Sequence, residues 1–228
     1  MLGFNIYGLR AGIQYNRRKE GREISDLLGL FPRITQDETE VVLKFKKKQR
    51  AQEIGALIYP HLAARNIWAM HSGGFHYRGG RLTVGPSNCG KSTFTSIALQ
   101  NGLPVLSDDI TLMRQVDGKI ELLPFYAKIF LNDRVIVPEK GVFRPAILKS
   151  FILPKKINGT TYVKKPEKRI DLLKRLVPQL LWSYEGVEKE RQKNIIEKLC
   201  DYPAFEVYWG PDIFKEQFDF KGLLDEVV

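Results

Sequence analysis

The chain has 228 residues, 43% hydrophobic and 27% charged, and a formal net charge of +10 at pH 7, which suits an anionic partner such as a nucleotide, a nucleic acid or an acidic peptide. This length suits one well-cored α/β domain with a small appendage and is too short for two ordinary domains with separate cores. No apolar run approaches the roughly 18 to 20 residues that span a bilayer, and no secretory signal is recognisable, so we expect a cytoplasmic protein without membrane segments.

The first seventy residues predict strands followed by a helix. Residues 3–15 and 39–46 carry the apolar and polar alternation of extended segments. Between residues 48 and 70 the apolar positions follow a helical spacing. Pro60 lies inside this segment and is predicted to break or kink the helix, because proline lacks the N–H group that a helix needs.

The middle of the chain predicts a hairpin, a helix and several strands. Residues 75–85 read as two short strands around Gly79-Gly80, a dipeptide that suits the positive φ angles of a tight turn. A helix is predicted over 92–101, ending at Asn101-Gly102. A strand is predicted over 103–113, with two carboxylates at its end or in its middle. Further strands are predicted over 119–125 and 127–133.

Beyond Pro166 the apolar spacing becomes mainly helical. Helices are predicted over 170–182, where Pro178 introduces a kink, and over 185–200. The remaining predicted elements are a strand over 204–210 and a helix over 220–227. Strands therefore outnumber helices in the middle, which favours an α/β fold with a mixed sheet. We expect a single domain over 1–228, with a β-rich subregion over 1–47 and a mainly helical subregion over 166–228.

Residues 85–93 read GPSNCGKST and fit the phosphate-loop pattern G-x-x-x-x-G-K-[ST]. The strand predicted before them and the helix predicted after them are the setting in which this spacing binds phosphate, because backbone N–H groups and the positive helix end then converge. Lys91 would reach the outer phosphates, and the Ser92 hydroxyl would bind a magnesium ion. The alternative is a chance match in a glycine-containing turn. The predicted nucleotide-binding residues are Gly85, Pro86, Ser87, Asn88, Cys89, Gly90, Lys91, Ser92 and Thr93.

Asp108 and Asp109 follow the predicted loop helix after a short connection. A magnesium ion on the outer phosphates needs a carboxylate besides Ser92, and the neighbouring carboxylate can accept the proton of an attacking hydroxyl. Adjacent residues of a regular strand point to opposite faces, so both acids reach one site only if the strand ends or bends there. A solvated acid pair in a turn is the alternative. His71 is a further candidate, although a lone histidine is more often structural than catalytic.

Two basic clusters and two cysteines remain. The cluster at 46–48 is expected to be solvated surface. The cluster over 155–169 brackets a Gly-Thr-Thr turn and is predicted to be either solvated surface or a loop that faces phosphate or substrate, which makes it the candidate acceptor-binding surface. Cys89 and Cys200 give neither a disulfide framework nor a metal spacing. Cys89 is either an acidified, oxidation-sensitive thiol or a small filler of the loop.

The run from His71 to Met113, with HSGG, the hairpin, GPSNCGKST and NGLPVLSDD in this order, resembles the catalytic core of the HPr kinase/phosphorylase family. The segments YGLRAGI and LPFYAKIFLND are similar, more weakly, to short stand-alone members, including those encoded beside lasso-peptide precursors, which phosphorylate a serine of the precursor. The resemblance implies a fold like the nucleotide-binding part of ATP-dependent phosphoenolpyruvate carboxykinase. The family's N-terminal domain and its Glu-Arg-Gly signature are not found, so neither HPr as substrate nor phosphorylase activity is expected.

Carried over residue by residue, the resemblance assigns Gly85, Gly90, Lys91 and Ser92 to phosphate and magnesium, Asp108 and Asp109 to metal and general base, and His71 to a supporting catalytic role. It implies an α/β P-loop kinase core that uses ATP and Mg²⁺ and phosphorylates a serine of a peptide or small protein. Which aspartate is the base stays open, as does assembly into a homo-oligomer, which is frequent among such relatives.

The alternatives are a small-molecule kinase, a non-catalytic nucleotide-binding regulatory module and a nucleic-acid-stimulated ATPase, although nucleic acid is not the expected partner. An ABC-type ATPase is not expected, because no LSGGQ-like signature follows the loop. A carboxykinase proper is not expected either, because the chain lacks the length for its oxaloacetate-binding half.

Overall fold

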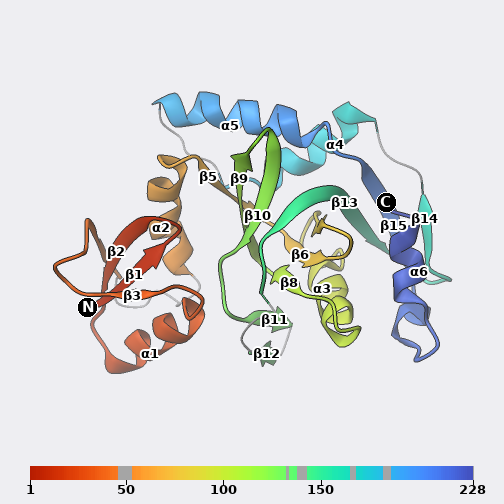
Figure 1. Cartoon of the computed structure of the whole chain (residues 1–228). Coiled ribbons are helices and arrows are strands. Elements are labelled where there is room, and N and C mark those ends of the chain that lie inside the picture. The colour runs from red at the N-terminus through yellow and green to blue at the C-terminus, as the bar shows by residue number, and fades with distance from the viewer. Residues whose placement is uncertain (46–52, 132–133, 138–142, 165–167, 182–185, 228) are drawn as a thin grey trace.

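The computed structural model describes all residues except 46–52, 132–133, 138–142, 165–167, 182–185 and 228. The first part of the chain forms a small four-stranded sheet, in which β1 lies between β3 and β2, and β4 pairs with β2 in parallel. Its elements are β1 (Leu2–Ile6), β2 (Leu9–Gln14), helix α1 (Arg18–Leu27), β3 (Arg33–Ile34) and β4 (Val41–Lys44). Helix α2 (Ile54–Ala63) follows and lies between this small sheet and the rest of the molecule (Figure 1).

The second sheet is larger and mixed, with strand order β5-β9-β10-β13-β7-β6-β8, while β15 pairs with β13 and β14. Its strands are β5 (Ile67–His71), β6 (Gly73–His76), β7 (Gly80–Thr83), β8 (Val105–Ser107), β9 (Ile110–Val116), β10 (Lys119–Pro124), β13 (Ala146–Lys156), β14 (Tyr162–Lys164) and β15 (Ala204–Trp209). Strand β13 runs parallel to β7 and β15 and antiparallel to β10. A separate hairpin is formed by β11 (Ile129–Leu131) and β12 (Arg134–Ile136). The predicted α/β class with a mixed sheet is confirmed.

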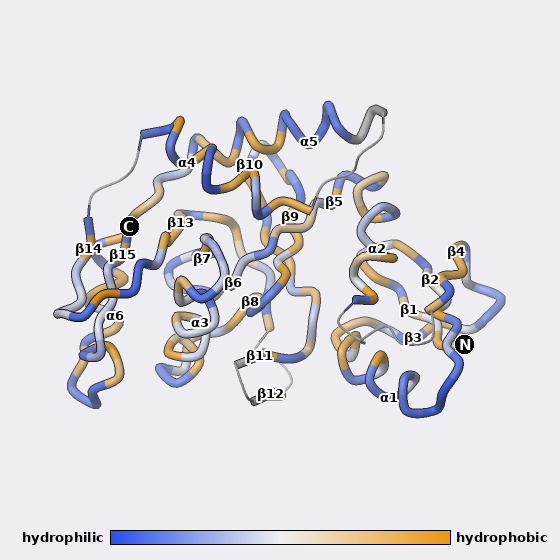
Figure 2. The backbone as a smooth tube through the Cα atoms, turned by 180° about the vertical axis from the view of Figure 1, so that it is seen from behind, coloured by the Kyte–Doolittle hydropathy of each residue, from blue (hydrophilic) through white to orange (hydrophobic). Residues whose placement is uncertain are grey.

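The remaining helices lie around the larger sheet: α3 (Lys91–Gln100), α4 (Arg169–Leu176), α5 (Gly186–Leu199) and α6 (Phe220–Asp225). Hydrophobic and hydrophilic residues alternate along α5 (Figure 2), which buries Ile195, Ile196 and Leu199 in the same apolar cluster as β13 and α4. No helix in the described parts of the chain is long and apolar enough to cross a membrane.

The small sheet shares its core with the larger one. One buried cluster contains Phe4 and Ile13 of the small sheet, Ile58 of α2, and Ala69 and Leu112 of β5 and β9. Burial of apolar surface is the main stabilising term in folding, so this common cluster ties the two sheets together. The predicted subregion boundaries at 47 and 166 are not tested by this packing and stay predictions.

Two local predictions at glycine and proline positions were wrong in detail. The predicted break at Pro60 is absent, because the helix continues to Ala63, Ile58 and Leu62 are fully buried and the Pro60 carbonyl still accepts the Ala64 N–H. The alternative, a kink at Pro60, stays a prediction. Residues 67–70, predicted as part of that helix, belong to β5. In the predicted hairpin the residues with positive φ are Arg78 and Gly79, while Gly80 already starts β7.

At Pro178, where a kink is predicted, the helix has already ended. Helix α4 stops at Leu176, and a short 3-10 turn (Val177–Gln179) contains the proline. Helix α1 and strand β13 were not predicted. The basic cluster that includes the end of β13 is predicted to be either solvated surface or a loop, whereas Lys155 and Lys156 are the last residues of this strand. The pairing of β13 with β7 ends at Ile152. Pro154 lies beyond it, so the N–H group that proline lacks is not needed for a hydrogen bond to β7.

Candidate active site

Three parallel strands end at one edge of the larger sheet. Strand β7 lies between β6 and β13, and β13 pairs in parallel with both β7 and β15. The segment 84–90 follows β7 at this edge, and α3 begins directly after it at Lys91. In open α/β sheets ligands bind outside the carboxyl ends of the strands, so this edge is where a site is expected.

The loop between β7 and α3 follows a path that only glycine allows at Gly90. The φ angle of Gly90 is +120°, and a Cβ atom there would lie 2.5 Å from Nε1 of Trp209. The Trp209 indole N–H in turn donates a 2.8 Å hydrogen bond to the carbonyl oxygen of Cys89. The last residue of β15 therefore fixes the loop where it enters α3.

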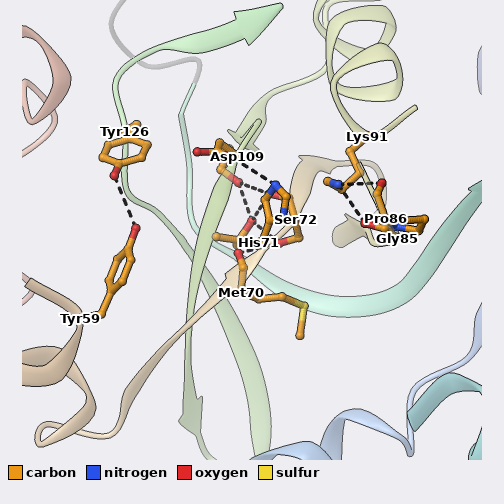
Figure 3. Close-up of polar contacts among 11 residues, drawn as sticks. Tyr59, Met70, His71, Ser72, Gly85, Pro86, Lys91, Asp109 and Tyr126 are labelled. Atoms are coloured by element: carbon orange, nitrogen blue, oxygen red, sulfur yellow. Dashed lines mark hydrogen bonds and ion pairs between the residues drawn. The ribbon is translucent and has the colours of Figure 1, made fainter. Parts of the chain in front are cut away.

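Lys91, the first residue of α3, turns its ammonium group back into the loop. It donates hydrogen bonds of 2.9 Å to the carbonyl oxygen of Gly85 and 3.2 Å to that of Pro86 (Figure 3). The side chain is buried, with the residue 7% exposed. The two carbonyl oxygens are neutral, so an incoming anion would be the opposite charge that a buried ammonium prefers beside it.

The chain breaks out of strand geometry at the acid pair. Strand β8 ends at Ser107 and β9 begins at Ile110, so Asp108 and Asp109 form the corner between them. This is the break that the sequence requires if both acids are to reach one site. Asp108 is only 3% exposed, whereas the Asp109 side chain is 41% exposed.

His71 meets Asp109 across neighbouring strands. Its Nε2 atom lies 3.2 Å from Oδ1 of Asp109, and Figure 3 shows the two side chains directed toward each other. The backbone holds them there, because the N–H of Ser72 donates a 3.0 Å hydrogen bond to the Asp109 carbonyl oxygen. Beneath them, Ser72 donates to the Thr111 hydroxyl at 3.0 Å and Ser107 donates to the Ser72 carbonyl oxygen at 3.1 Å. Sequence reasoning missed this buried hydroxyl cluster.

A pocket of about 580 Å³ joins these parts. It is lined by His71, Ser87, Asn88, Gly90, Lys91, Ser92, Thr93, Asp108, Asp109, Lys156 and Trp209. Most of the predicted site residues thus meet in one place, although their roles stay predictions. Gly85, Pro86 and Cys89 are not among the lining residues, and the first two serve through the carbonyl oxygens that bind Lys91.

Trp209 was not predicted as part of the site, and Lys156 was predicted only as part of the candidate acceptor-binding surface. Trp209 ends a predicted strand, and only the pairing of that strand beside β13 brings it to the loop. Lys156 belongs to the basic cluster over 155–169, which is predicted to be either solvated surface or a loop that faces phosphate or substrate. The signal that could have identified both is their shared position at the carboxyl ends of two apolar strands.

The predicted magnesium ligands fit the ion in their chemistry. Ser92, Asp108 and Asp109 bring oxygen donors to the same pocket. Within the described ranges, no three His, Cys, Asp or Glu side chains form a metal cluster. Magnesium commonly takes one or two carboxylates and completes its shell with water and phosphate oxygens, so a sparse oxygen set of this kind suits it.

The structure argues against an activated thiol at Cys89. Burial raises the pKa of the Cys89 thiol above its ordinary value, and the opposing effect of Lys91 is smaller. The thiol lies where a Cβ atom on Gly85 would be 2.8 Å away, so it packs against the loop backbone. The interpretation as a loop filler is favoured, and an acidified Cys89 is not. Burial likewise raises the pKa of Cys200.

The predicted basic segment 155–169 is divided between different environments. Lys155 forms an ion pair with Glu206, which is 4% exposed, and donates a 3.2 Å hydrogen bond to the Tyr208 hydroxyl. Arg175 of α4 reaches the same carboxylate at 2.6 Å. Lys165 lies outside the described residues. The strand end at Lys155 is therefore a structural part of the sheet and not a loop.

Replacing Glu206 by glutamine should destabilise the fold by roughly 1–3 kcal/mol, because Lys155 and Arg175 would lose the carboxylate that they share. The value is below that of a fully buried pair, since the Arg175 and Lys155 side chains are 29% and 36% exposed. Denaturant unfolding measures it. Glu190→Gln removes an exposed carboxylate paired with Lys193 and should change stability by no more than about 0.5 kcal/mol. Equal effects of the two variants would contradict a structural role for Glu206.

The fold defines a mixed α/β protein whose predicted phosphate loop and acid pair share one pocket. No family model matches the chain, and no curated protein matches its sequence. Among solved structures the chain is similar to the Hpr(Ser) kinase/phosphatase from Coxiella burnetii, with 14% sequence identity and a TM-score of 0.40. The match covers 70% of this chain and 87% of that one. Similarity at this level carries no conclusion about activity or substrate.

Proposed function

We propose that this chain is an ATP- and Mg²⁺-dependent kinase that transfers the γ-phosphoryl group to a serine hydroxyl of a peptide or small protein. The observation that carries the proposal is the single pocket in which the loop before α3, the buried Lys91 and the His71–Asp109 pair meet. A site for nucleotide binding alone needs the first two of these. The third adds a group that can accept a proton.

The loop and the start of α3 supply the phosphate site of this proposal. Helix N-termini attract anions through unpaired N–H groups and the positive end of the helix dipole. Lys91 is the first residue of α3, so its charge adds to the same field. In the proposed complex, phosphate oxygens take the place of the carbonyl oxygens of Gly85 and Pro86 as partners of the Lys91 ammonium.

Ser92 and Asp108 are the residues that would hold Mg²⁺. Asp108 lines the pocket from a buried position, which suits a fixed ligand better than a group that must meet an acceptor. When bound, the ion neutralises charge on the β- and γ-phosphate oxygens. The protein residues keep their own tasks, which are to bind the phosphate tail and to orient the acceptor.

Asp109 is the proposed general base. The acceptor oxygen forms the new bond to the γ-phosphorus, the bond from that phosphorus to the β,γ-bridging oxygen breaks, and the hydroxyl proton passes to the carboxylate while ADP leaves. Nε2 of His71 lies 3.2 Å from Oδ1 of Asp109, and in the proposed mechanism this contact orients the carboxylate toward the pocket. The exposure of Asp109 is what favours it over Asp108 as the base.

A serine in a peptide or small protein is the acceptor class that the resemblance to short stand-alone kinases supports. The protein should be incubated with Mg²⁺ and γ-labelled ATP, and with serine peptides, matched peptides carrying alanine in place of serine, or small hydroxyl compounds. We expect label on the serine peptides and one ADP per phosphoryl group transferred. Label on a small compound alone would overturn the peptide assignment. ATP binding without acceptor-dependent ADP formation would identify a non-catalytic module, and absence of ATP binding would overturn the whole proposal.

A further inference from the structure

The pocket has two opposite sides, divided by the loop that follows β7. In the larger sheet β7 lies between β13 and β6, with β15 beyond β13 and β8 beyond β6. The acid pair follows β8, and Asp109 contacts His71 at the end of β5. Lys156 and Trp209 end β13 and β15, which lie side by side (Figure 1). The acid pair therefore lies on one side of the loop, and Lys156 lies on the other.

Lys156 reaches the pocket because of its place in the strand. It follows Lys155 on β13, and adjacent strand residues point to opposite faces. Lys155 is engaged with the buried carboxylate of Glu206, whereas Lys156 lines the pocket. Sequence alone does not distinguish the two lysines, but their side chains point to opposite faces of the sheet and so have different neighbours.

The Lys156 ammonium rests on an aromatic ring that also holds the loop. Its Nζ atom lies 5.5 Å from the centre of the Trp209 ring, and the two residues are direct partners in the parallel pairing. The same indole binds the Cys89 carbonyl oxygen through its N–H. An exposed cation–π contact is worth about 0.5–1 kcal/mol, less than a hydrogen bond to a charged group, so an ammonium placed here can move to a phosphate at small cost.

We propose that Lys156 binds the α- and β-phosphates of the nucleotide, on the side of the loop away from Asp109, and that Trp209 positions both Lys156 and the loop. The inference rests on the proposed function, because it requires a nucleotide with its γ-phosphate beside the acid pair. If the γ-phosphate lies beside the acid pair, the triphosphate crosses the loop, and its α- and β-phosphates lie near the ends of β13 and β15. Lys156 then contributes equally to binding of ATP and ADP.

The test is nucleotide affinity, measured by calorimetry with Mg²⁺-ATP and Mg²⁺-ADP on the wild type, Lys156→Ala and Lys156→Arg. Lys156→Ala should weaken both nucleotides about 10-fold and leave kcat at saturating ATP unchanged, since binding equal in ground and transition states affects KM alone. Lys156→Arg, which keeps the charge, should recover most of the affinity. Lys149→Ala is the matched control, because it removes an exposed lysine from the same strand beside Gly79, at the other end from the pocket.

The outcomes separate this inference from the proposed function. If the wild type binds both nucleotides and Lys156→Ala binds them as tightly, the inference fails while the proposed function stands. Loss of ATP affinity alone, a fall in kcat, or a rise only in acceptor KM would each overturn the assignment to the non-transferred phosphates. An equal loss of nucleotide affinity in Lys149→Ala would show that Lys156 acts through the overall charge of the protein and not through contact with the phosphates. If the wild type binds neither nucleotide, both proposals fail. If thermal unfolding shows that Lys156→Ala does not fold, the nucleotide affinities of Lys156→Gln and Lys156→Arg are compared instead.

Discussion

Asp109→Asn is expected to lower kcat about 100- to 10,000-fold and to leave the affinity for Mg²⁺-ADP unchanged, because the amide cannot accept the acceptor proton while general base catalysis supplies a factor of this size. The substitution keeps the shape of the side chain, which is 41% exposed and contacts His71, so the fold is not expected to suffer. Steady-state kinetics with a serine peptide gives kcat, and calorimetry gives the ADP affinity.

Two comparisons make this result specific to Asp109. Asp117→Asn applies the same change to an exposed aspartate at the distant turn between β9 and β10, and turnover should stay at the wild-type value. Asp108→Asn tests the proposed division of roles, since loss of a metal-binding carboxylate should raise the Mg²⁺ concentration needed for half-maximal activity. If Asp109→Asn turns over normally while Asp108→Asn does not, the base has been assigned to the wrong residue.

The parts of the site that could be predicted are those encoded in one short stretch of chain. The phosphate-loop motif from Gly85 to Thr93 and the acid pair each follow a local strand, and the requirement that the strand break at Asp108 and Asp109 is met because β8 ends and β9 begins there. Local rules sufficed to locate the motif and the acid pair, since turn residues and apolar periodicity act over a few positions. The single strand predicted over 103–113 is instead two strands, β8 and β9, with the acids between them.

The parts that could not be predicted depend on which strands become neighbours. Trp209 touches the loop across 120 positions of sequence, and Lys156 reaches the pocket only because β13 pairs with both β7 and β15. Strand β13 was not predicted, and its two basic end residues were assigned to a cluster interpreted as either solvated surface or a loop. Register decides which of Lys155 and Lys156 faces the pocket, and a shift by one residue would exchange them.

Gly90→Ala is expected to destabilise the protein by roughly 2–6 kcal/mol and to abolish measurable binding of Mg²⁺-ATP. Two effects add. An alanine at φ +120° is strained by about 1–3 kcal/mol, and its Cβ would lie 2.5 Å from Nε1 of Trp209, so the loop or the indole must move, at a further 1–3 kcal/mol. Either movement displaces the N–H groups at the start of α3 from the phosphate site. Denaturant unfolding and calorimetry measure the two consequences.

Gly102→Ala, at the other end of α3, separates the effect of backbone strain from the effect of the steric clash with Trp209. Gly102 also has a positive φ, +72°, but a Cβ atom there meets nothing within 4 Å. This variant should lose only about 1 kcal/mol of stability and keep its nucleotide affinity, because φ near +60° is the mildest positive region for an alanine. Adding Trp209→Leu to Gly90→Ala removes the ring and should recover part of the stability lost. If the double variant is no more stable than the two single changes predict by addition, Gly90 and Trp209 are not coupled, and the loop is not held by β15.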